Sequence, residues 1–248
     1  MRDEIVSYWN SSSEGYSRYA RNSMAVRWEK RAWQEIFNEA LGREPLKVLD
    51  VGTGPGIIAF QLAELGHDVV GVDLSDGMLI EAEKNAKRYG LSVTFKKGDA
   101  QDLPFPDAAF DAVVSRWVLW TLPEPEKALK EWQRVVKPGG KVIYVDGNWH
   151  SDLANSRKRK AWYYIGRSLT AVTELRNPWK GKSNVKGDEL WSSKASRPSA
   201  DIMMLRKLGV NEIEVKEGLK KRTLRGLQYA KYGFWSDYFL ISVTKGRP

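Results

Sequence analysis

The sequence predicts a doubly wound α/β fold built on a mostly parallel sheet. Short β-rich runs of continuous apolar residues alternate with segments of helical apolar spacing, which is typical of parallel strands covered on both faces. A glycine-rich loop separates the first such strand from the next helix, as in nucleotide-binding α/β proteins. Near the end of the chain, two β-rich runs lack a helix of crossover length between them, so we expect them to pair antiparallel.

The expected elements divide the chain into a core and two additions. Residues 1–42 form an N-terminal helical cap, with a short helix, a break at 10–15 and a longer helix from about residue 23. The core comprises 43–146 and 201–248, and an insertion at 147–200 would serve as a substrate lid. The expected strands are 46–51, 68–73, 92–96, 110–115, 141–146, 212–216 and 238–244.

Composition narrows the class of protein. The chain has 248 residues, no cysteine and a net charge of +9, so disulfides and a thiol nucleophile are excluded. We see neither a signal peptide nor a membrane span, and we expect a cytoplasmic protein. Residues 151–200 hold eleven Lys or Arg against four acids, and such a basic field attracts anions.

The glycine loop is Gly52-Thr53-Gly54-Pro55-Gly56, directly after Asp50-Val51. Glycines let the backbone turn tightly and approach a ligand closely. The dinucleotide fingerprint places its third glycine at position 57, where this chain has Ile. A carboxylate at the loop mouth repels a pyrophosphate and suits a ligand with an ammonium and a sulfonium, so charge favours S-adenosylmethionine (SAM) over NAD.

Further polar residues follow the next three strands. Asp73 ends the second strand, where a carboxylate can accept from both ribose hydroxyls. Asp99 follows the third strand and can accept from the adenine amino group, while Ala100 lets the ring lie close. Ser115 ends the fourth strand, where the backbone would face the methionine part of the cofactor.

These motifs resemble those of class I SAM-dependent methyltransferases, and most of all the small-molecule branch that includes ubiquinone and menaquinone methyltransferases. The resemblance rests on Val48 to Gly56, Val70 to Ser75, Gly98 to Ala100 and Leu129 to Gly140. It implies a seven-stranded sheet of order 3-2-1-4-5-7-6 with strand 7 antiparallel. We expect SAM, and its product S-adenosylhomocysteine, to contact Tyr16, Tyr19, Asp50, Gly52, Thr53, Gly54, Gly56, Asp73, Leu74, Met78, Asp99, Ala100, Gln101, Ser115 and Arg116.

Aromatic residues and one histidine are candidates for the acceptor side. Trp9, Trp117, Trp120 and Trp149 would line the substrate pocket, and Arg116 would hold an anionic group or pair with a surface acid. His150 follows the fifth strand and would act as a general base, unless it is an exposed loop residue. His67 is expected at the surface, and no metal site is indicated.

The sequence thus predicts transfer of a methyl group from SAM to an O, N, S or C nucleophile of a small molecule. The alternative is an RNA methyltransferase, which would use the basic insertion at 157–197 and the aromatic run 162–164 as a backbone and stacking surface. Neither function implies stable membrane insertion. The acceptor atom and the oligomeric state stay open.

Overall fold

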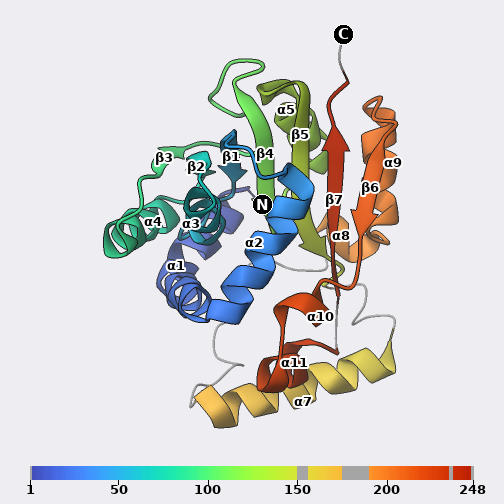
Figure 1. The fold of residues 1–248 in the computed structure, drawn as a ribbon. Helices are drawn as coiled ribbons and strands as arrows, with labels where there is room; N and C mark the ends of the chain where they lie inside the picture. The colour runs from blue at the N-terminus through green and yellow to red at the C-terminus, as the bar shows by residue number, and fades with distance from the viewer. Residues whose placement is uncertain (1, 150–155, 175–189, 235–236, 247–248) are drawn as a thin grey trace.

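The computed structural model describes residues 2–149, 156–174, 190–234 and 237–246. They form a seven-stranded sheet of order β3-β2-β1-β4-β5-β7-β6 (Figure 1). β1 to β5 pair in parallel, whereas β7 is antiparallel to β5 and β6, so the expected topology is confirmed. The strands are β1 Lys47–Val51, β2 Asp68–Asp73, β3 Thr94–Lys97, β4 Phe110–Arg116, β5 Val136–Gly147, β6 Ile213–Lys216 and β7 Tyr238–Thr244.

Helices cover both faces of this sheet because successive strand residues point to opposite sides. Val48 packs in the core on one face, while Leu49 packs in the core on the other. The first core includes residues of α2 (Arg27–Leu41) and α3 (Ile57–Glu64). The second includes residues of α5 (Pro125–Val135) and α9 (Ser199–Lys207).

The N-terminal segment is more regular than its composition indicated. α1 runs without a break over Arg2–Ala25, so the expected loop at 10–15 is wrong. Asn10 accepts hydrogen bonds with its side-chain oxygen from Ser75 Oγ at 2.7 Å and from Gly77 N at 3.0 Å. Through these contacts the Asn10 side chain bonds to the start of α4 (Asp76–Tyr89). It therefore does not compete for the backbone hydrogen bonds of α1, and the helix continues.

Two other local expectations are also wrong. His67 is buried rather than at the surface, and its Nδ1 accepts from Leu46 N at 3.2 Å. β5 begins at Val136 rather than at residue 141, because Val136 already pairs with Phe110 before an irregularity in the ladder. Tertiary pairing therefore extends the strand through a segment whose glycines and proline predicted only a turn.

The insertion supplies α7 (Arg157–Glu174) and α8 (Trp191–Lys194). α7 packs against α11 (Gly226–Tyr232), and both lie with α10 (Lys220–Thr223) beyond the end of β5 (Figure 1). His150 lies outside the described residues. No helix in the described ranges combines the length and apolar character needed to cross a bilayer.

Candidate functional site

The glycine loop joins β1 to α3 and is held from beneath by Asp50. This carboxyl is 1% exposed and accepts from Thr53 Oγ1 at 2.7 Å. Burial raises the pKa of Asp50 to about 7, since the charged form is disfavoured away from water. Asp50 therefore supports the loop from inside. Near neutral pH its carboxyl group is only partly ionised.

Asp73, at the carboxyl end of β2, faces the same loop. Its side-chain oxygens accept from Gly54 N and from Ser75 N, each at 2.9 Å. Ser75 caps α4 by accepting from Met78 N. The Asp73 carboxylate therefore lies between the β1 and β2 loops, and each of its oxygens keeps a second lone pair for a ligand hydroxyl.

Asp99 follows β3 and pairs with α1. Its carboxylate accepts from Gln101 N and forms an ion pair with Arg2 at 2.8 Å. Further along α1, Ser17 Oγ accepts from Asn85 of α4 at 3.1 Å. α1 thus reaches from the β3 loop to α4 and forms one wall over the predicted cofactor residues.

Arg116, the last residue of β4, has its guanidinium between two tryptophans. The guanidinium carbon lies 5.0 Å from the ring centroid of Trp33 and 4.3 Å from that of Trp117. Its Nη1 is buried and has no hydrogen-bond partner among the described residues. Burial raises the pKa of Glu29, and the Arg116 charge lowers it in part. Arg116 is therefore a cation with a donor left over for a ligand.

An aromatic cluster surrounds this cation. Trp117 stacks on Tyr19 with centroids 6.2 Å apart and meets Trp149 edge-on at 5.9 Å. Tyr238 contacts both Trp117 and Trp149. The structure thus brings together Tyr19, Trp117 and Trp149, whereas Trp9 instead packs on Tyr8 and Tyr16.

Other predicted residues serve the loops themselves. Ser115 Oγ donates to Val51 O at 2.8 Å and ties β4 to β1. Gln101 Oε1 accepts from Glu124 N at 2.7 Å. Trp120 donates its indole N–H to Trp117 O at 2.9 Å. The remaining predicted cofactor residues, Gly52, Gly56, Leu74, Met78 and Ala100, lie in or beside the β1, β2 and β3 loops.

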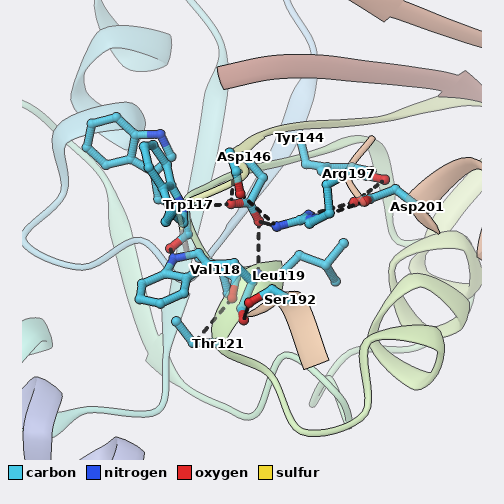
Figure 2. Close-up of polar contacts among 12 residues, drawn as sticks. Trp117, Val118, Leu119, Thr121, Tyr144, Asp146, Ser192, Arg197 and Asp201 are labelled. Carbon is cyan, nitrogen blue, oxygen red and sulfur yellow. Dashed lines mark hydrogen bonds and ion pairs between the residues drawn. The ribbon is translucent and has the colours of Figure 1, made fainter. Parts of the chain in front are cut away.

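Sequence reasoning missed a buried ionic cluster beside the Trp117 turn (Figure 2). Arg197 is wholly buried and contacts Asp146 at 3.1 Å and Asp201 at 2.6 Å. Asp146 also accepts from Trp120 N at 2.9 Å and from Gly147 N at 2.8 Å. Burial raises the pKa of Asp146, and the Arg197 charge opposes that rise. The one available signal was the position of Asp146 at a strand end.

This cluster holds a strained turn. Trp117 has φ 61°, a conformation that costs a non-glycine residue about 1–3 kcal/mol unless its surroundings impose it. Trp117 N donates to Val145 O at 2.8 Å, and Trp120 N, three residues after Trp117, donates to the Asp146 carboxylate. Ser192 Oγ donates to Trp120 O at 2.8 Å. The insertion is thereby fastened to the turn that carries the aromatic cluster.

The strand ends fit an adenosyl ligand. Asp73 and Asp99 offer acceptors for hydroxyl and amino groups. A Cβ added to Gly54 would meet nothing nearer than Met78 Sδ at 3.9 Å, so a ligand can approach this backbone closely.

Residues 49–144 match the family model described as a methyltransferase domain. Over these residues the chain is similar to a methyltransferase domain. Over 123 residues it is 41% identical to a demethylmenaquinone methyltransferase of Thermus thermophilus, covering 49% of this chain and 54% of that protein. A demethylmenaquinone methyltransferase of Renibacterium salmoninarum is 37% identical over 145 residues, covering 58% of this chain and 59% of that protein. The chain thus spans little more than half the length of these relatives.

Solved structures share the fold of this chain. The structural similarity covers residues 49–144 and also much of the chain outside that range. A SAM-dependent methyltransferase of Aquifex aeolicus has a TM-score of 0.59 at 18% identity, covering 92% of this chain and 97% of that one. Phosphoethanolamine N-methyltransferase 2 of Haemonchus contortus has a TM-score of 0.61 at 20% identity, covering 88% and 53%. The [4+2]-cyclase SpnF has a TM-score of 0.60 at 22% identity, covering 88% and 81%. The fold therefore serves more than one reaction.

Proposed function

We propose that this protein transfers a methyl group from SAM to a small aromatic acceptor that carries an anionic oxygen, as a deprotonated quinol does. The observation that carries the proposal is the Arg116 guanidinium inside an aromatic cluster, whose buried Nη1 has no hydrogen-bond partner among the described residues. The name of the menaquinone relatives supports an acceptor of this class.

On the cofactor side, Asp73 would accept from the ribose hydroxyls and Asp99 from the adenine amino group. The Gly54 backbone would lie against the ligand, since its surroundings leave that space open. When bound, SAM supplies a methyl group on a positively charged sulfur. The carboxylates bind and orient this ligand by charge and by hydrogen bonds.

On the acceptor side, Arg116 would hold the anionic oxygen and so keep the acceptor in its deprotonated, nucleophilic form. Trp117 and Trp149 would pack against the acceptor ring and exclude water, which strengthens the interaction with Arg116. His150 remains our candidate for accepting the acceptor proton. Residues 1–42 and 147–200 would together cap the two ligands, since α1 contacts Asp99 and α8 contacts the Trp117 turn.

Cofactor binding is tested by calorimetric titration with S-adenosylhomocysteine and, in parallel, with NAD. The wild type should bind only the former, and Asp73→Asn should weaken binding about 100-fold, since a buried hydrogen bond to a charged group is worth roughly 1.5–3 kcal/mol. Asp68→Asn is the matched control, because Asp68 is exposed at the opposite end of β2. Binding of NAD alone, or equal affinities of all three proteins, would contradict the cofactor assignment.

Acceptor chemistry is tested by transfer of radioactive methyl groups from SAM to demethylmenaquinol and to its O-blocked, neutral analogue. The wild type should methylate only the ionisable acceptor. Arg116→Met should lower kcat/KM at least about 100-fold and Arg116→Lys less, because a lysine keeps the charge without the planar fork. S-adenosylhomocysteine affinity should fall far less than kcat/KM in both variants; an equal loss would place Arg116 on the cofactor side instead. Equal turnover by wild type and Arg116→Met would refute the role of Arg116.

A further inference from the structure

The outer face of α7 is apolar where it meets solvent. Tyr164, Ile165 and Val172 are 51%, 46% and 74% exposed. Together with Ala161 and Ser168 they are spaced three, four, seven and eleven residues along the helix, which places them on one face. A contiguous exposed stripe of this kind marks an interaction surface.

Basic residues stand at one end of this stripe. Arg157, Lys158 and Lys160 occupy the first turn of α7, and all three are exposed. Within the helix Glu174 is the one acid, at its last position. An apolar stripe with lysines and arginines beside it is typical of a helix that lies in the interface of an anionic bilayer.

The inner face of α7 is already occupied by the protein. Trp162 stacks on Phe234 with ring centroids 4.6 Å apart. Gly166 lies so close to Lys231 O of α11 that an added Cβ would be 2.2 Å from it. Within α7 itself, Arg167 Nη1 donates to the Tyr163 hydroxyl. One face of the Trp162 ring is thus already covered, which disfavours a single-stranded RNA as the partner.

We propose that α7 docks this protein peripherally on an anionic lipid bilayer through Tyr164, Ile165 and Val172, with Lys158 and Lys160 at the headgroups. α7 lies beyond the carboxyl end of β5, the edge of the sheet that carries Arg116 and Trp149 (Figure 1). Docking would therefore turn the acceptor side toward the lipid surface. The interaction can be measured apart from methyl transfer, since it uses neither the predicted cofactor residues nor Arg116.

The test is sedimentation of the full chain with phosphatidylcholine vesicles that either contain or lack phosphatidylglycerol. The wild type should partition into the anionic vesicles only, and more weakly at high salt. Lys158→Glu with Lys160→Glu should lower the partition coefficient at least about 25-fold, since each basic residue is worth about fivefold. Ile165→Asn with Val172→Asn should lower it roughly tenfold.

Matched controls lie on other helices. Ile80→Asn with Met203→Asn removes apolar groups that are 53% and 62% exposed, and Lys87→Glu with Arg88→Glu reverses two charges on α4. Both controls should sediment like the wild type, and thermal melting should show that every variant is folded. Equal partition of the wild type into vesicles with and without phosphatidylglycerol would overturn the proposal. So would vesicle binding that survives the apolar pair, or retention of a single-stranded RNA that depends only on the lysines.

Discussion

The two sides of the sheet's carboxyl edge are held by different kinds of contact. On the β1–β3 side, Asp50 bonds to Thr53 and Asp99 to Gln101, so each carboxyl supports the loop that follows it. On the β4–β5 side, Asp146 bonds to Trp120, 26 residues earlier, and to Arg197, far along the chain in the insertion. On the first side Asp73 and Asp99 also reach Gly54 and Arg2, through a backbone hydrogen bond and an exposed ion pair. The second side is a buried ionic cluster that joins three segments.

The largest expected effect is the loss of stability when the ionic cluster on the β4–β5 side is broken. Arg197→Met leaves Asp146 and Asp201 buried without their cation, which should lower the free energy of unfolding by about 3–5 kcal/mol. Lys207→Met breaks an exposed pair with Glu126 and should cost at most about 1 kcal/mol. Urea unfolding measures both, and a similar small loss in the two variants would show that the cluster is not what holds the acceptor side.

Asp50 should give the cofactor side a distinct pH dependence. Its pKa is raised from 3.8 to about 7 by burial, so the folded state binds a proton that the unfolded state releases. The resulting stability is complete below about pH 4 and is lost as pH rises through about 7, by up to roughly 4 kcal/mol.

Asp50→Asn removes this titration while keeping an acceptor for Thr53. The stability advantage of the wild type over the variant should therefore shrink between pH 4 and pH 7 and then level off. Urea unfolding across this range provides the measurement. A difference that stays constant with pH would mean that Asp50 ionises as freely in the folded protein as in the unfolded chain.

Two glycines of one loop should separate stability from ligand binding. At Gly52, with φ +67°, an added Cβ would lie 2.2 Å from a side-chain methyl of Val118, so Gly52→Ala must also displace that side chain. Gly54 has φ +53° and open space. Gly54→Ala should cost about 1–2 kcal/mol of backbone strain, and Gly52→Ala should cost more.

In calorimetry at a temperature where the variant is fully folded, Gly54→Ala should still weaken S-adenosylhomocysteine binding. The reason is that its added methyl group occupies the space expected for the ligand. Thermal melting gives the stability of each variant in the same buffer. Unchanged affinity in Gly54→Ala would remove Gly54 from the cofactor side.

The contrast between the two sides also explains what the sequence could predict. The strands, the glycine loop and the position of Asp73 were predictable because their signals are adjacent in the chain: apolar runs, turn glycines and acids at strand ends. The strand order was predicted from the family resemblance that these motifs carry. The partnership of Asp146 with Arg197 was not, because nothing near position 197 indicates where its guanidinium lies. Distant partners also explain why the predicted break in α1 is wrong. Asn10 is held in the helix by hydrogen bonds from Ser75 and Gly77, far along the chain.

The smallest effect should come from Arg2, where the cap meets the cofactor side. Arg2 pairs with the carboxylate proposed for the adenine amino group, yet its side chain is 58% exposed. Such an exposed pair is worth about 0–1 kcal/mol. If the pair competes with the ligand, Arg2→Ala should tighten S-adenosylhomocysteine binding by up to about fivefold, most clearly at low salt. Arg18→Ala, an exposed change elsewhere on α1, should leave affinity unchanged. Weaker binding in Arg2→Ala would instead mean that α1 closes over the bound ligand and that Arg2 helps to hold it there.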